Sequence, residues 1–81
     1  MHVVLDARNL CERAAAHKYM KKVFSFPDFY GENQDALYDL LSEMNDLHIH
    51  LIHAKEGEGY YGKVMSVFED IKDAEIDIID M

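Results

Sequence analysis

The chain has 81 residues, 49% of them hydrophobic, and a net charge of −8 at pH 7. This length predicts one domain, residues 1–81, and the hydrophobic content favours a folded protein over a disordered one. The acidic balance argues against a nucleic-acid partner or an anionic membrane surface. It would attract a basic partner, although solubility explains the net charge alone better.

Cellular location can be predicted from the single cysteine and from the N-terminus. Cys11 is the only cysteine, which excludes an internal disulfide and fits a reducing compartment. The N-terminus lacks the basic start and apolar run of a signal peptide, and no later stretch is long enough to span a membrane. We therefore expect a cytoplasmic protein.

The apolar periodicity predicts three strands and three helices. The strands are expected over residues 2–6, 47–53 and 76–79, and the helices over residues 11–24, 34–44 and 60–72. Asn9 and Asn33 are the expected caps of the first two helices. Pro27 falls in the loop between them, and Gly57 and Gly59 interrupt the chain before the third helix.

The order of these elements predicts the fold class. Strands that alternate with helices favour a parallel sheet joined by right-handed crossovers. We therefore predict an α/β fold of two layers, in which a three-stranded parallel sheet has its helices packed on one face.

The charged residues are unevenly distributed. Residues 23–54 contain no lysine or arginine. The acidic residues of this segment are Asp28, Glu32, Asp35, Asp39, Glu43 and Asp46. A solvated surface usually mixes charges of both signs, so this segment is expected to face a cationic partner.

The predicted second helix concentrates this acidity on one face. Its inward positions are Ala36, Leu37, Leu40, Leu41 and Met44, and its outward positions are Asp35, Tyr38, Asp39, Ser42 and Glu43. Asp39 is four residues from both Asp35 and Glu43, and each such pair of like charges costs a helix about 0.2–0.5 kcal/mol. Because this arrangement lowers stability, we interpret it as a row of carboxylates aimed at a cationic pocket.

The loop before this helix adds two aromatic residues and a glycine. Adjacent residues rarely both point inward, so one of Phe29 and Tyr30 is expected to be exposed beside the acidic face. An exposed aromatic next to charged groups is typical of binding hot spots. Gly31 is expected to supply a backbone angle that other residues resist.

The run over residues 26–41, Phe-Pro-Asp-Phe-Tyr-Gly-Glu-Asn-Gln-Asp-Ala-Leu-Tyr-Asp-Leu-Leu, resembles the barstar family signature. The predicted third helix and closing strand fit the same layout. Barstars are intracellular inhibitors of secreted microbial ribonucleases such as barnase. The resemblance implies a cytoplasmic, non-catalytic inhibitor without a cofactor, whose partner is a basic microbial ribonuclease.

The resemblance also implies roles for single residues. Asp39 matches the carboxylate that enters the phosphate site of the nuclease, and Asp35 matches an acid that contacts an arginine. The implied partner-binding residues are Phe29, Tyr30, Gly31, Asn33, Asp35, Tyr38, Asp39, Ser42, Glu43 and Asp70. Phe29, Tyr38 and Glu43 replace a tyrosine, a tryptophan and a glycine of the family prototype. An immunity or antitoxin protein for a different nuclease toxin is therefore an alternative.

A glycine pattern and a pair of acids could indicate other functions. Residues 57–62 match the G-x-G-x-x-G pattern of dinucleotide sites. Glu56 and Glu58 would repel a pyrophosphate there, and the chain is too short for the usual two-part nucleotide domain. Asp35 and Asp39 could form an acid/base pair, but a convex helix face lacks the cleft that catalysis needs. We assign no catalytic residues.

Histidines suggest an alternative from another class. His48 and His50 alternate on one face of the predicted second strand, His53 falls on the other, and His2 can lie near the pair. Two histidines at this spacing can bind zinc. We interpret them as exposed polar residues and assign no metal ligands, and a histidine-rich metal-binding or regulatory module is the alternative.

Overall fold

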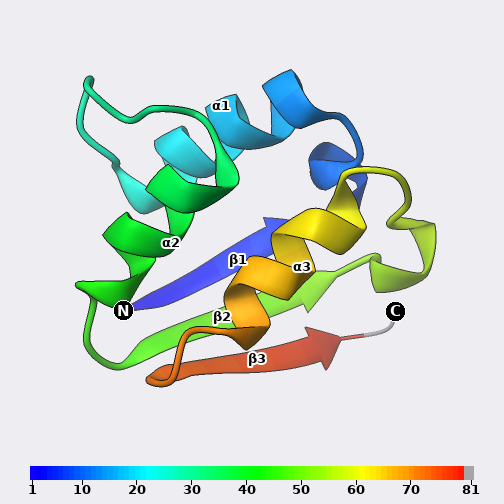
Figure 1. Cartoon of the computed structure of the whole chain (residues 1–81). Coiled ribbons are helices and arrows are strands. Elements are labelled where there is room, and N and C mark those ends of the chain that lie inside the picture. Colours follow the sequence, from blue (N-terminus) through cyan, green and yellow to red (C-terminus); the bar gives the residue numbers. More distant parts are fainter. Residues whose placement is uncertain (80–81) are drawn as a thin grey trace.

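The computed structural model describes residues 1–79 and has two layers (Figure 1). The sheet contains strands β1 (His2–Asp6), β2 (Leu47–Ile52) and β3 (Ala74–Ile79). All three strands are parallel, in the order β1–β2–β3. The helices are α1 (Arg13–Phe24), α2 (Gln34–Ser42) and α3 (Tyr61–Glu69), with short 3-10 turns η1 (Ala7–Leu10) and η2 (Ala54–Glu56). The predicted α/β fold is confirmed.

All three α-helices cover the same face of the sheet (Figure 1). The inward side chains of the central strand β2 are Leu47, Ile49 and Leu51, all fully or almost fully buried. Burying one such side chain contributes about 1.5–3 kcal/mol. The side chains between them point to the opposite face, which no helix of residues 1–79 covers, and His48 and His50 belong to this open face. Within residues 1–79, no helix is long and apolar enough to cross a membrane.

The start of α1 differs from the sequence prediction. Asn9 lies within the 3-10 turn η1 and does not cap α1, which begins at Arg13 rather than at residue 11. Asp6 caps η1, since its carboxylate accepts a hydrogen bond from the Arg8 backbone N–H at 3.0 Å. This bond starts the 3-10 turn η1, which carries the chain out of β1 before α1 begins. Glu12 stands at the cap of α1 and makes no side-chain capping bond.

Two helices end earlier than predicted. The structure ends α2 at Ser42 rather than Met44, and α3 at Glu69 rather than Lys72. Ile71 lies beyond the end of α3 and is still buried in the core. The helical spacing of apolar residues therefore extends beyond the end of α3, because Ile71 in the following turn packs into the same core.

Candidate partner-binding surface

The loop between α1 and α2 is held by two buried aromatic residues. Phe26 stacks on Phe24 with ring centroids 5.2 Å apart, and Tyr30 packs against Phe26 at 4.7 Å. The Tyr30 N–H donates to the Pro27 carbonyl at 3.0 Å, which closes the turn between them. Since Tyr30 points inward, its neighbour Phe29 points outward and is 83% exposed. The expectation that one of this pair is exposed is confirmed.

A buried histidine, His17, contacts this loop from the core side. The ring nitrogens of His17, on α1, lie 2.6 Å from the hydroxyls of Tyr30 and Tyr60. Burial lowers the pKa of His17 and raises the pKa of Tyr30, so the ring is neutral, with one nitrogen donating and the other accepting. His17 is not among the residues predicted to be functional, although its spacing to Met20 and Phe24 matches the inward face of α1.

The entry into α2 depends on Gly31 and Asn33. The Asn33 side chain accepts from the Ala36 N–H at 2.8 Å, which confirms it as the cap of α2. Gly31 was predicted to take a left-handed backbone angle, and this prediction is wrong, because that angle falls on Glu32 at φ 52°. At Gly31 a side chain would make tight contacts, and small shifts of its neighbours would accommodate it. A Cβ there would lie 3.3 Å from Asn33 Nδ2 and 3.4 Å from the Ala36 Cβ.

The outward face of α2 presents its acids without partners. Asp35, Asp39 and Glu43 are exposed. Among residues 1–79 none of these three carboxylates forms an ion pair or accepts a hydrogen bond. Tyr38 lies among them and is 42% exposed. The Ser42 hydroxyl donates to the backbone carbonyl of Asp39 at 2.9 Å, leaving the Asp39 carboxylate free.

A cleft of about 270 Å³ joins this helix face to the loop. Its lining residues are Phe29, Tyr30, Gly31, Ala36, Asp39, Leu40 and Glu43. Five of these belong to the predicted partner-binding set, and Ala36 and Leu40 were predicted only as core. Both are half-buried, because they lie at the edge of the apolar stripe of α2. Their position at this edge is the sequence signal that could have predicted them as cleft residues.

The other five predicted residues lie outside the cleft. Asn33 caps α2, and Asp35, Tyr38 and Ser42 belong to that helix. Asp70 follows the end of α3, where it is exposed. Because α2 and α3 pack against each other, Asp70 belongs to a neighbouring element, but it does not line the cleft.

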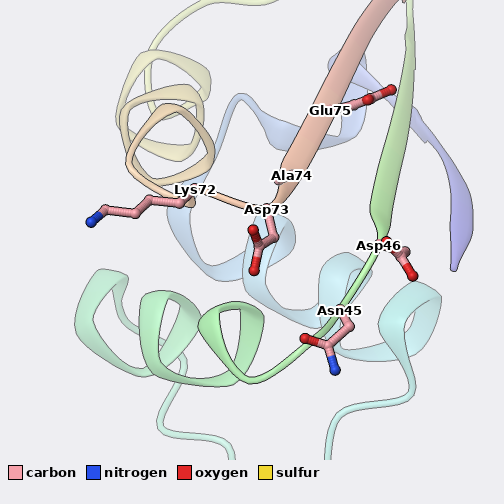
Figure 2. Close-up of a pocket in the computed structure, with 6 residues that line it drawn as sticks. All are labelled: Asn45, Asp46, Lys72, Asp73, Ala74 and Glu75. Carbon is pink, nitrogen blue, oxygen red and sulfur yellow. The ribbon is translucent and has the colours of Figure 1, made fainter.

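A larger hollow, of about 620 Å³, lies where β2 and β3 begin (Figure 2). Its lining residues are Asn45, Asp46, Lys72, Asp73, Ala74 and Glu75. The labelled side chains point in different directions rather than toward one point (Figure 2). Ligands of parallel sheets bind at the carboxyl ends of strands, whereas this hollow lies at the opposite edge. The cleft beside α2 is the stronger candidate because the exposed Phe29 and the unpaired carboxylates of Asp39 and Glu43 line it.

The glycine pattern at residues 57–62 has a structural explanation. Gly59 has φ 60°, and a Cβ there would lie 2.8 Å from the Cys11 carbonyl oxygen. The neighbouring Tyr60 N–H donates to that same carbonyl at 3.0 Å. Gly59 thus lets this turn approach η1 closely. This packing role explains why a glycine stands here, and nucleotide binding is not needed to explain it.

The structure is thus a small two-layer α/β domain with an acidic helix face and the exposed Phe29 beside it. A model of the family described as barstar (barnase inhibitor) matches residues 1–77. The chain therefore belongs to the barstar family, which consists of inhibitors rather than enzymes.

A relative from Bacillus subtilis (strain 168) is named "Putative ribonuclease inhibitor YrdF". The two sequences are 36% identical over 50 residues, which cover 62% of this chain and 55% of the relative. The matched part is thus about half the length of that relative.

Proposed function

We propose that this protein inhibits a basic microbial ribonuclease by placing the acidic face of α2 in the enzyme's active site. The observation that carries this proposal is the row of exposed, unpaired carboxylates, Asp35, Asp39 and Glu43, in a chain of the barstar family. A secreted nuclease endangers the cell that makes it before export. The inhibitor would therefore act in the cytoplasm.

The chemistry of RNA cleavage explains why a carboxylate is suited to this task. A ribonuclease stabilises a negatively charged phosphoryl transition state with preorganised donors and cationic side chains. Such a site attracts any anion of suitable size. The Asp39 carboxylate would fill it as a mimic of the RNA phosphate, and it offers the enzyme no bond to cleave. Several charge-assisted hydrogen bonds would offset the cost of removing this charge from water.

The position of Asp39 favours tight binding. Its backbone belongs to α2, whose start is capped by Asn33, and its carbonyl is bonded by the Ser42 hydroxyl. The side chain therefore projects from a rigid support, and little conformational entropy remains to be lost on binding. Phe29 stands across the cleft from the helix and offers an apolar ring for stacking on an aromatic or histidine side chain.

Charges around the cleft would contribute mainly to the rate of association. Asp35 and Asp70 are exposed and lie outside the cleft, so salt screens them strongly. Together with the net charge of −8, they would attract a basic enzyme over long distances. Steering of this kind raises association rates by about 10–10³-fold at low salt.

Glu43 favours a second candidate within the same class. It lines the cleft and adds a negative charge there, where the family prototype has a glycine. A partner must supply an additional cationic group or donor to this position. A nuclease toxin other than a barnase-type ribonuclease could do so, and the chain would then be its immunity or antitoxin protein.

The proposal is tested by titrating the purified protein against a barnase-type ribonuclease, following RNA cleavage at low and at physiological salt. We expect stoichiometric inhibition that weakens as salt rises and is lost in Asp39→Ala. Glu12→Ala is the matched control, because it also removes one exposed acid that has no side-chain capping bond.

The control separates a specific contact from net charge. If both variants lose inhibition equally, only the overall charge acts, and the proposed role of Asp39 is wrong. If the unaltered protein does not inhibit, the barnase-type target is wrong. The same titration is then repeated against other basic nuclease toxins.

A further inference from the structure

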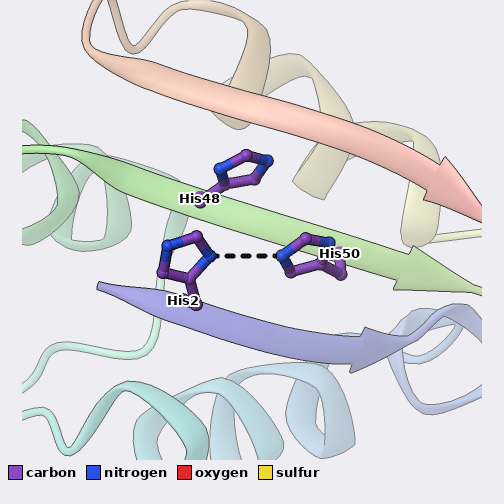
Figure 3. A group of neighbouring side chains, drawn as sticks. All are labelled: His2, His48 and His50. Carbon is purple, nitrogen blue, oxygen red and sulfur yellow. Dashed lines mark hydrogen bonds between the residues drawn. The ribbon is translucent and has the colours of Figure 1, made fainter.

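Three histidines gather on the open face of the sheet, opposite the helices (Figure 3). Pairing of β1 with β2 places His2 directly beside His48, and His50 follows two residues along β2 on the same face. The rings of His48 and His50 stack with centroids 4.6 Å apart, and His2 stacks on His48 at 4.9 Å. The parallel register therefore brings together residues that are far apart in the sequence.

We propose that His2, His48 and His50 form a zinc-binding site. One ring nitrogen of each lies within 4.8 Å of the other two. His2 Nδ1 and His50 Nε2 are 3.3 Å apart (Figure 3). Zinc binds imidazole nitrogen at about 2.0–2.1 Å in tetrahedral geometry, which places two ligand nitrogens about 3.3 Å from each other. This pair already has that spacing. The His48 and His50 planes are within 6° of parallel, so the rings must rotate for their in-plane nitrogens to point at one ion.

The neighbouring strand supplies a carboxylate that would support the site. Asp77, on β3, accepts a hydrogen bond from His48 Nε2 at 2.7 Å and lies 3.8 Å from His50 Nδ1. Carboxylates that bond to metal-ligating histidines orient their rings and raise their basicity. Glu75 lies 3.6 Å from His48 Nδ1 and adds a second negative charge on this face. A cation among the rings would thus be well compensated.

The surroundings leave room for solvent at the fourth ligand position. A hollow of about 210 Å³ borders the cluster, and His2, His48 and Glu75 are among its lining residues. Three histidines with a water ligand form a complete zinc coordination shell. Imidazole ligands also accept copper and nickel, so zinc is the ion chosen for the test because tetrahedral geometry matches the observed spacing.

Zinc here would stabilise the fold and leave the α2 surface free. The cluster joins β1 to β2 on the face that no helix covers, so zinc binding to the native state should raise the melting temperature. Because the cluster lies across the sheet from the cleft, variants of these histidines should retain ribonuclease inhibition. The outcome for zinc is therefore independent of the proposed function.

The experiment is a calorimetric titration of the tag-free protein with zinc at a pH where histidine is neutral. We expect one zinc ion per chain, binding at least tenfold weaker in His48→Ala and in His50→Ala, and a roughly 10–100-fold loss in Asp77→Asn. His53→Asn is the control. His53 lies outside the cluster, and asparagine tolerates its left-handed backbone angle, φ 56°.

A spectroscopic arm tests the geometry. Cobalt bound to the unaltered protein should show the intense visible absorption of a tetrahedral site, and His48→Ala should lose it. Circular dichroism of each variant checks folding, and Asp77→Asn replaces any histidine variant that fails to fold. The proposal is overturned if zinc does not bind at submillimolar concentration, or if the control and the cluster variants bind equally.

Discussion

The open face of the sheet and the outward face of α2 both carry acidic side chains. The acids on the sheet contact a histidine side chain of the protein, and those on α2 have no such contact within residues 1–79. On the open face of the sheet, Asp77 accepts a hydrogen bond from His48, and Glu75 lies 3.6 Å from the same ring. On the outward face of α2, Asp35 and Asp39 have no ionic partner within residues 1–79.

This difference shows how a fold can separate two uses of the same chemical group. An acid that bonds to another side chain of the same protein orients that side chain, as Asp77 orients the His48 ring. Acids left unpaired on a rigid helix cost stability through mutual repulsion. That cost is recovered only when an external cation arrives, so the unpaired surface is the one suited to a partner.

The largest expected effect compares Asp39→Ala with Asp77→Ala. Removing one member of a buried ion pair costs about 3–5 kcal/mol, so Asp39→Ala should weaken inhibition at least a hundredfold. Asp77→Ala should leave inhibition unchanged. Inhibition assays with both variants measure this contrast, and equal losses would show that the two acidic surfaces do not differ in function.

Asp39→Ala should also leave the fold intact. Its carboxylate has no partner in the described chain, and its removal relieves two like-charge pairs. We expect a free energy of unfolding that is unchanged or higher by a few tenths of a kcal/mol, measured by urea denaturation. A clear loss of stability would mean that Asp39 is structural.

Phe29→Ala should have the next largest effect on binding. Truncating an aromatic hot spot costs about 2 kcal/mol, which corresponds to roughly thirtyfold weaker inhibition. Stability should barely change, because Phe29 is 83% exposed. Denaturation and inhibition measured on the same preparation give both quantities. Unchanged inhibition would place Phe29 outside the interface.

Tyr30→Phe should reverse this pattern. The change removes the hydroxyl that pairs with His17 Nδ1 at 2.6 Å and leaves a buried nitrogen without its partner. We expect a loss of about 1–2 kcal/mol in the free energy of unfolding, with nearly unchanged inhibition at temperatures where the variant is folded. Strong loss of inhibition in the folded variant would mean that the Tyr30 hydroxyl contacts the partner.

His17 makes stability depend on pH. Burial, and to a lesser extent Arg13, holds the pKa of His17 below the ordinary value of about 6.5. Below pH 6.5 the unfolded chain therefore binds a proton that the folded chain does not, and stability falls until the lowered pKa is reached. Denaturation midpoints measured across this range check the fall, which should persist in His48→Ala if His17 is the cause.

Glu43→Lys should raise stability while it weakens binding. A lysine four residues after Asp39 replaces a repulsive pair with an attractive one, and it also suits the end of a helix. The free energy of unfolding should rise by roughly 0.5–1 kcal/mol. Inhibition should weaken because the new cation would face a basic enzyme. Tighter inhibition would mean that the partner presents an acid to this position.

Local patterns predicted the fold well, and they failed where the chain makes tight turns. The alternating Leu47, Ile49 and Leu51 indicated a one-sided sheet, and Asn33 indicated the start of α2, since both signals depend on near neighbours. The 3-10 turn after Asp6 was not predicted, because a four-residue turn held by one capping bond leaves no apolar periodicity in the sequence. The left-handed angle at Glu32 likewise depends on the packing of the whole loop.

The site could be predicted only in part, for a similar reason. The acids of α2 are visible in sequence because an acidic face has a helical period. The role of His17 could not be predicted, because Tyr30 and Tyr60 reach it from different elements. The approach of His2 to His48 also depends on the register of β1 against β2, which the sequence of either strand alone does not determine.

The most direct test of the account is competition between this protein and a nucleoside 3′-phosphate for the ribonuclease. If the Asp39 carboxylate occupies the phosphate site, the apparent dissociation constant should rise in proportion to nucleotide concentration once that exceeds the nucleotide's own dissociation constant. We expect this dependence for the unaltered protein. An affinity that does not change with saturating nucleotide would contradict it, because the protein would then bind outside the active site.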